Sequence, residues 1–182
     1  PYQFDEFFSQ SMVFGGDDFA LYLKKDNEVI ATYAAKILNF GAFLEDFESY
    51  FYAESGNQLK INMENLSESI LYSPNQRHMY SSCQWVSTSH RGKGMGMMLD
   101  HLKKNICFDI FNAYSNYAIH KEAFKEYHLK GLHYDDSIWL ATVPQGGVGG
   151  AGEDKDKVYN VTWVTKENWA NKLDDVRKLY NR

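Results

Sequence analysis

Cysteine, proline and long apolar runs are all scarce in this sequence. The two cysteines, Cys83 and Cys107, provide neither a disulfide framework nor the spacing of a metal site. No stretch approaches the roughly eighteen consecutive apolar residues of a membrane-spanning helix, and no positively charged, apolar leader is present. We therefore expect a soluble protein of a reducing, cytoplasmic compartment, with no metal and no membrane partner. Because the chain begins at Pro1 without a methionine, we also expect a processed or trimmed product.

Positive charge is not in excess either. The formal charge is −5 and the pI is near 5.7, whereas a nucleic-acid-binding face needs a local surplus of lysine and arginine. This balance disfavours nucleic acid as a partner and is compatible with a cationic substrate such as an amine. Aromatic residues, in contrast, are plentiful, with thirteen Tyr and twelve Phe in 182 residues. One domain of this length can therefore build a sizeable core.

Three glycines crowd into one short segment, Arg91-Gly92-Lys93-Gly94-Met95-Gly96. The segment follows a strand-like run over residues 78–86 and precedes a helix-like run over 97–106. Glycine lets the backbone turn tightly and approach a ligand closely, and a helix that begins here adds unpaired N–H groups and the positive end of its dipole. With the two adjacent cations, these features favour a phosphate or pyrophosphate. The alternative is a solvated basic turn that only connects two elements.

The spacing of this loop differs from that of the common nucleotide-binding motifs. Gly92, Gly94 and Gly96 run Gly-x-Gly-x-Gly, whereas the Rossmann fingerprint is Gly-x-Gly-x-x-Gly, and no Ser or Thr follows the lysine as in a P-loop. The loop resembles Gln/Arg-x-x-Gly-x-Gly/Ala, the coenzyme A pyrophosphate loop of the GNAT superfamily of acyl-CoA-dependent N-acyltransferases. The first position of that pattern is filled by Arg91.

A second motif with the same resemblance lies downstream. It reads Ala123-x-x-x-Tyr127-x-x-x-Gly131-Leu132, similar to the family's Ala-x-x-x-Tyr-x-x-x-Gly-Phe. The resemblance is close over residues 78–143 and looser over 19–38. It implies an α/β (α+β) GNAT fold, in which a mixed central sheet is flanked by helices and its fourth and fifth strands splay apart. One such domain is expected over residues 1–182, with an abbreviated N-terminus and a segment inserted at 39–77.

Periodicity and turn residues predict the individual elements. Strands are expected over residues 19–25, 29–38, 78–86, 114–119, 138–143 and 158–164. Helices are expected over residues 2–12, 42–53, 63–71, 97–106, 121–129 and 167–180. The apolar face that should cover the sheet from 97–106 consists of Met97, Met98, Leu99, Leu102 and Ile106. We expect Gly131 to stand at the usual C-terminal glycine position of the helix before it.

The inserted segment has two interpretations. Its aromatic residues either pack on the sheet or form a substrate lid, since loops of this length are often functional. In the second case, residues 41–76 would shape the acceptor side of the cleft, with acidic residues that attract an amine. The residues concerned are Phe43, Phe47, Tyr50 and Phe51, with Glu45, Asp46, Glu48 and Glu54.

By resemblance, the cofactor is acetyl-CoA, used as a cosubstrate, and the acceptor is a primary amine of a small molecule or protein. Main-chain groups of Gln84, Trp85 and Val86 would bind the pantetheine arm and the thioester carbonyl. The amides that would hold the pyrophosphate belong to Arg91, Gly92, Lys93, Gly94, Met95 and Gly96. Tyr127 would protonate the departing thiolate. His120 stands where the family often has asparagine, and either bonds the pantetheine or caps the next helix.

The general base departs from the family pattern. Many members carry a glutamate on the fourth strand where this chain has Tyr80, and no Asp or Glu occurs from Gln76 to Leu99. His78, Tyr80 and Ser82 alternate on one face of the strand. His78 is the one of these with a suitable ordinary pKa, although a histidine at a strand end is more often a surface residue. Deprotonation of the amine through ordered water is equally open.

These features predict an N-acetyltransferase that moves an acetyl group from acetyl-CoA to a primary amine by direct attack. The alternative is a catalytically inactive GNAT-fold module that binds acyl-CoA, which the missing strand carboxylate and the short N-terminus would suit. Modification of a nucleic-acid base would need a basic face, which the acidic composition disfavours. A homodimer is left open.

Overall fold

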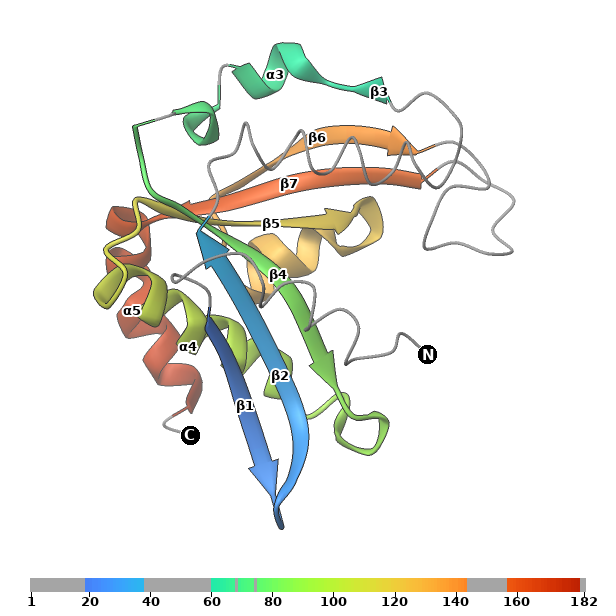
Figure 1. Ribbon diagram of the computed structural model, residues 1–182, viewed down its shortest axis with the longest axis vertical. Helices are drawn as coiled ribbons and strands as arrows, with labels where there is room; N and C mark the ends of the chain where they lie inside the picture. The colour runs from blue at the N-terminus through green and yellow to red at the C-terminus, as the bar shows by residue number, and fades with distance from the viewer. Residues whose placement is uncertain (1–18, 38–59, 68, 74, 144–156, 181–182) are drawn as a thin grey trace.

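Seven strands form one mixed sheet in the order β1-β2-β4-β5-β7-β6-β3 (Figure 1). This computed structural model describes residues 19–37, 60–67, 69–73, 75–143 and 157–180. The strands are β1 (Phe19–Lys25), β2 (Glu28–Ile37), β3 (Lys60–Ile61), β4 (His78–Val86), β5 (Ser115–Lys121), β6 (Asp136–Val143) and β7 (Lys157–Thr165). The longer helices are α4 (Met95–Asp109) and α5 (Lys166–Tyr180), and the short helix α3 spans Met63–Ser67. Further short helical turns are Ile70–Tyr72, Thr88–His90, Glu122–Phe124 and Tyr127–Gly131.

Most predicted elements are confirmed within a few residues. The helix expected over 63–71 is found as two pieces, α3 and the 3-10 turn Ile70–Tyr72. The two-residue edge strand β3 was not predicted, because its pairing with β6 lies far along the chain. The helices expected over 2–12 and 42–53 lie outside the described residues, as do the aromatic and acidic residues of the inserted segment. The assignment of residues 1–182 to one domain stays a prediction.

The first hairpin shows how local sequence sets register. Asp26 and Asn27 join β1 to β2, and their φ angles of 50° and 67° are both left-handed. A two-residue turn of that hand matches the twist of the flanking strands, and Asn and Asp tolerate it better than other residues with side chains. The antiparallel pairing then runs from Lys25 opposite Glu28 to Phe19 opposite Ala35.

The centre of the sheet opens into a V. Strands β4 and β5 are parallel and pair from His78 with Ser115 to Ser81 with Ala118. After Ser81 the two strands no longer pair with each other. The rest of β4, from Cys83 to Val86, pairs with β2, and the rest of β5, from Ile119 to Lys121, pairs with β7. Figure 1 shows the two strands diverging. The splayed central strands expected from the sequence are therefore confirmed.

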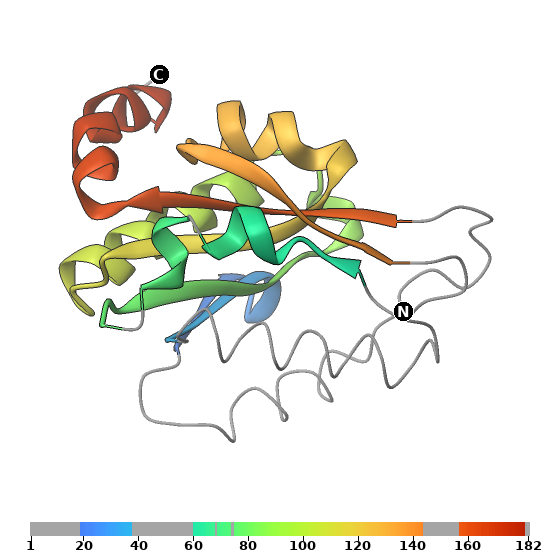
Figure 2. The same cartoon turned by 90° about the horizontal axis from the view of Figure 1, so that it is seen from above.

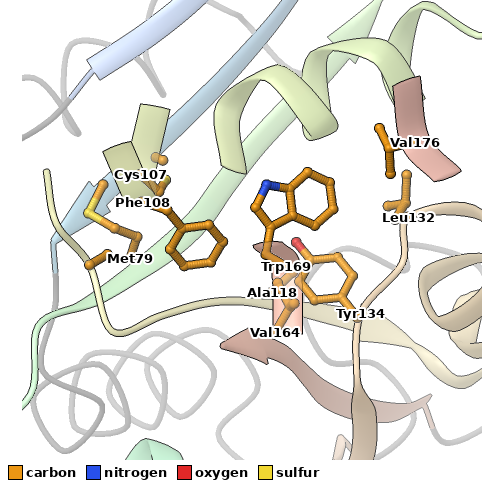
Figure 3. Packing of buried hydrophobic residues seen from close by; sticks show 11 residues of the cluster. Met79, Cys107, Phe108, Ala118, Leu132, Tyr134, Val164, Trp169 and Val176 are labelled. Atoms are coloured by element: carbon orange, nitrogen blue, oxygen red, sulfur yellow. The ribbon is translucent and has the colours of Figure 1, made fainter. Parts of the chain in front are cut away.

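Alternation along β5 separates two of the core clusters, because successive side chains leave opposite faces of a sheet. Tyr117 belongs to the cluster that includes Leu66 of α3, and Ala118 to the cluster under α4 and α5. Figure 3 shows Trp169 of α5 in the second cluster, with Phe108 of α4 nearby. Figure 2 shows α5 and the helical segment after β5 on the same side of β7.

The buried face of α4 differs from the predicted one. Leu99 is buried as predicted, but Leu102 is 45% exposed, and the helix also buries Cys107 and Phe108 together with charged side chains. Three of these, Asp100, Lys103 and Lys104, are fully buried. The predicted face was incomplete because it was drawn from apolar residues alone. Charges can be buried where they neutralise one another and fill their hydrogen bonds.

The carboxylate of Asp100 lies between the two ammonium groups. Its oxygens are 2.7 Å from Nζ of Lys103 and 2.5 Å from Nζ of Lys104. Lys103 also donates to Oγ of Ser81 on β4, and Lys104 donates to the carbonyl of Leu132. Lys104 Nζ lies 3.6 Å from the ring centroid of Tyr134, close enough for a cation–π interaction. The cluster therefore ties α4 to β4 and to the chain before β6.

Burial and charge act in opposite directions on this cluster. Burial alone would raise the pKa of Asp100, but the two lysines outweigh it and hold that pKa well below its ordinary value. Burial lowers the pKa of Lys104 to about 7, against the opposing effect of Asp100. The single negative charge of Asp100 cannot neutralise two ammonium groups, and Lys104 is the lysine whose pKa falls toward neutral pH.

Replacing Asp100 by asparagine should destabilise the fold strongly. Asp100→Asn removes the carboxylate that bonds these two buried ammonium groups, and such a loss typically costs about 3–5 kcal/mol of unfolding free energy. Urea denaturation would measure it. The matched control is Asp175→Asn on α5, whose exposed pair with Lys178 should leave the unfolding midpoint unchanged. Equal midpoints for the two variants would contradict the role given to the cluster.

Candidate active site

An open cleft of about 510 Å³ lies alongside the part of β4 that has left β5. Its walls come from the end of β4, the following loop, the first turn of α4 and the helical segment after β5. The lining residues are Gln84, Trp85, Val86, His90, Arg91, Gly92, Gly94, Met95, Gly96, Met97 and Tyr127. The two sequence motifs, far apart along the chain, thus meet in one cleft.

Two glycines shape the loop between β4 and α4. Gly92 and Gly94 have φ angles of 75° and 76°, a left-handed conformation that residues with a Cβ adopt only at a cost. Gly94 directly precedes α4, and no side chain caps the helix there. The first intrahelical bond runs from the amide of Met98 to the carbonyl of Gly94 at 3.0 Å. The amides of residues 95–97 therefore remain for a ligand at the positive end of the helix.

The cations of the loop are held close to its own backbone. Nε of Arg91 donates to the carbonyl of Val86 at 3.1 Å, and Nζ of Lys93 donates to the carbonyl of Ser89 at 3.1 Å. Among the described residues, no Asp or Glu lines the cleft. Positive charge at this end is therefore not neutralised by the cleft wall.

Gly96 is needed for a close approach between α4 and β4. Nε2 of Gln84 donates to the carbonyl of Gly96 at 2.6 Å. A Cβ added at Gly96 would lie 2.6 Å from the same nitrogen. The absence of a side chain on this residue lets the amide of Gln84 cross from the strand to the first turn of the helix.

Tyr127 projects into the cleft from an irregular helical segment. A 3-10 turn, Glu122–Phe124, leads into a π-helix, Tyr127–Gly131, in place of the regular helix expected over 121–129. The phenol is 45% exposed. Burial of part of the ring, and then the charge of Asp100, raise the pKa of Tyr127, so that the phenol stays protonated through neutral pH.

Solved structures share the fold of this chain, although no protein-family model and no curated protein matches the sequence. One is a variant of the spermidine N-acetyltransferase SpeG from Vibrio cholerae, 12% identical, with a TM-score of 0.51; the match covers 94% of this chain and 79% of that one. Another is the CoA-dependent acyl-homoserine lactone synthase BjaI, solved with SAM and isopentyl-CoA, 12% identical, with a TM-score of 0.51 over 89% of this chain and 65% of that one. The chain has the GNAT fold. The predicted resemblance is confirmed at that level.

Within this GNAT fold, the two candidates for a strand base lie away from the cleft. His78 stands at the opposite end of β4, fully buried, with Nδ1 2.7 Å from Oγ of Ser115 and Nε2 3.3 Å from the carbonyl of Ser73. Burial lowers the pKa of His78. The expectation of a surface residue was therefore wrong, because these two partners satisfy the ring inside the protein. Tyr80 packs against Tyr117, with ring centroids 5.4 Å apart, in the cluster under α3.

His120 does not cap the helical turn that follows it, and its bond to pantetheine stays a prediction. It is buried and does not line the cleft. Its Nδ1 is 2.9 Å from the carbonyl of Lys121, so that nitrogen donates, whereas a helix N-cap has to accept from an N–H group. The ring stacks on His128 at 4.1 Å and so fastens the helical segment to β5. The capping interpretation was wrong for this reason.

Two residues that line the cleft, His90 and Met97, were not among the predicted site residues. His90 directly precedes the loop motif and could have been suspected from that adjacency, whereas nothing in the sequence marked Met97. In the described part of the chain, no helix is long and apolar enough to cross a membrane. In the same part, no three His, Cys, Asp or Glu residues gather as metal ligands would.

Gly131 sets the position of Tyr127 rather than ending a helix in the left-handed conformation. The helical segment does end at Gly131, as predicted, but the left-handed residue after it is His133, with φ of 58°. A Cβ on Gly131 would lie 3.0 Å from Cδ2 of the Tyr127 ring. That separation is tighter than ordinary van der Waals contact, so the ring rests against the bare glycine.

Adding a methyl group at Gly131 should therefore move the phenol. In Gly131→Ala the crowding of the ring and the higher helix propensity of alanine are opposing effects of about 1 kcal/mol each, so stability should change little. A crystal structure should show the Tyr127 ring displaced by several tenths of an ångström or rotated. Gly96→Ala is the control, since its methyl meets the movable end of Gln84 and should leave Tyr127 in place. An unmoved ring in Gly131→Ala would contradict this role.

Proposed function

We propose that this protein is an N-acetyltransferase that transfers an acetyl group from acetyl-CoA to a primary amine by direct attack. One observation carries the proposal: a single cleft is lined both by the glycine loop at the start of α4 and by the phenol of Tyr127. The GNAT fold supports acyl transfer as the general reaction. Acetyl-CoA, the amine and a cytoplasmic location are our proposals for this chain.

The cofactor would lie along the open side of β4. The pairing of β4 with β5 ends at Ser81, so a ligand can lie beside the end of β4 and meet main-chain groups of residues 84–86 there. At the far end, the amides of residues 95–97 and the positive charges of Arg91 and Lys93 suit a pyrophosphate. The cofactor would thus run from the centre of the sheet to the helix N-terminus.

The reaction itself requires few groups. The amine nitrogen attacks the thioester carbonyl, a C–N bond forms, and the C–S bond breaks as the tetrahedral intermediate collapses. The thiolate then takes the phenolic proton of Tyr127, which water replaces because the side chain is 45% exposed. The phenol is protonated at neutral pH, as a general acid must be, because burial and then the charge of Asp100 raise its pKa rather than lower it.

Water is our proposal for removal of the amine proton. No carboxylate lines the described cleft, and His78 is buried at the opposite end of β4. The cleft is open to solvent on one side, which gives the proton a direct route out. The same missing carboxylate supports the alternative, an inactive module that binds acyl-CoA. Release of CoA thiol in the presence of an amine panel separates the two, because the inactive module would bind without turnover.

Binding of acetyl-CoA should depend on the left-handed backbone at Gly94. Gly94→Val forces a β-branched residue into φ near 76°, which should distort the loop and weaken binding at least tenfold, or about 1.4 kcal/mol. Gly94→Asn is the control, since asparagine tolerates that conformation and should lose less affinity. Calorimetry on folded protein measures both. A Gly94→Val protein with wild-type affinity would overturn the assignment of the loop.

Turnover should depend on the hydroxyl of Tyr127 more than binding does. Tyr127→Phe keeps the ring against Gly131 and removes only the proton, so kcat should fall by about 10²–10⁴-fold. The Kd for acetyl-CoA should stay within about twofold of the wild-type value. If kcat is unchanged with every accepted amine, Tyr127 is a packing residue and the acid lies elsewhere.

A further inference from the structure

We propose that His90 binds a phosphate oxygen of CoA through Nε2 and makes cofactor affinity depend on pH. The inference rests on the proposed function, because it concerns a ligand of the same cleft. His90 ends the 3-10 turn Thr88–His90, directly before Arg91, and its side chain lines the cleft beside the glycine loop. The loop motif that indicated a pyrophosphate site does not include this residue.

Two serines fix the orientation of the imidazole. Nδ1 lies 2.8 Å from Oγ of Ser87 and 3.0 Å from Oγ of Ser89. Ser87 is itself anchored, because its amide donates to the carbonyl of Ile30 on β2 at 2.9 Å. The amide of His90 donates to the carbonyl of Ser87, also at 2.9 Å, which closes the turn. Both side-chain contacts use the same ring nitrogen, so Nε2 is the nitrogen left to meet a ligand.

This support works in either charge state of the ring. A hydroxyl can donate to the neutral Nδ1 or accept from it when the ring is charged. When Nδ1 accepts, the hydrogen of the neutral ring is on Nε2, and when the ring is charged both nitrogens carry one. In both cases Nε2 is a donor, which is what a phosphate oxygen requires. The serines therefore orient the ring without fixing its charge.

The surroundings of His90 favour an anion. Arg91 and Lys93 follow it in the loop, and no Asp or Glu is found in the described lining of the cleft. A protonated ring would add a positive charge at this end and attract an anion there. A phosphate beside Nε2 would therefore draw a proton onto the ring, and affinity should rise as the pH falls.

Imidazole is the kind of side chain whose charge can change between about pH 6 and 8.5. The other charged or titratable groups that line the cleft are Arg91 in the loop and Tyr127 across from it, while Lys93 of the same loop bonds the carbonyl of Ser89. Guanidinium, ammonium and phenol groups ordinarily titrate far above this range. Ser87, Ser89 and the carbonyl of Ile30, which lie around the turn, carry no charge.

Calorimetric titration with CoA at about pH 6 and about pH 8.5 tests the proposal. The wild-type Kd should be several-fold to tenfold lower at the acidic pH. His90→Gln should remove most of this difference, and His90→Lys, with its fixed charge, should bind tightly at both values. His133→Asn is the matched control, because His133 lies outside the cleft lining and asparagine suits its left-handed backbone; it should keep the wild-type profile. Circular dichroism checks that each variant is folded.

Dephospho-CoA, which lacks the 3′-phosphate, identifies the phosphate concerned. A pH dependence that persists with this ligand assigns His90 to the pyrophosphate, and one that disappears assigns it to the 3′-phosphate. A His90→Gln profile equal to that of the wild type would overturn the role of His90 and leave the CoA site standing. If the wild type binds no CoA at either pH, the proposed function is wrong, and this inference with it.

Discussion

The buried ion cluster on α4 holds together the two walls of the cleft. Asp100 binds Lys103 and Lys104, and these lysines reach outward to Ser81 of β4 and to the carbonyl of Leu132. Leu132 in turn donates its amide to the carbonyl of Tyr127 at 3.0 Å. The helix whose first turn faces the ligand is therefore connected through buried charges to the segment that carries the phenol. Hydrogen bonds to a fixed carboxylate are directional, whereas apolar packing is not. The ion cluster therefore resists sliding between these elements more than apolar packing alone would.

Strand positions could be predicted from the sequence because alternation and turn residues are local signals. The hairpin at Asp26 and Asn27 is an example, since both residues suit the left-handed turn that was found. The buried face of α4 could not be predicted in the same way. Lys103 and Lys104 are ordinary surface residues by type, and only their convergence on Asp100, Tyr134 and Ser81 makes burial favourable. That convergence is a property of the folded chain.

The residues of the candidate site were likewise predictable only where the signal is local in the sequence. The glycine loop was predicted from its spacing, and Tyr127 from a motif that resembles the one in the GNAT family. His78 and Tyr80 were singled out by strand alternation, by the ordinary pKa of histidine and by the family position of a glutamate. None of these gives the distance from the cleft or the partners that bury a ring. His90 escaped notice because its significance comes from two serines that converge on one of its nitrogens. Residue type and spacing do not reveal such a convergence.

The π-helix at Tyr127–Gly131 has a consequence for how this site can change through insertion and deletion. A π-turn holds one residue more than an α-turn, so the loss of a single codon here would leave a regular helix. Residues on either side would then rotate relative to one another by about 100°, the angle per residue of an α-helix. The tyrosine would remain in the sequence but would aim away from the first turn of α4. The place of the phenol thus depends on the number of residues in this turn as much as on the identity of any of them.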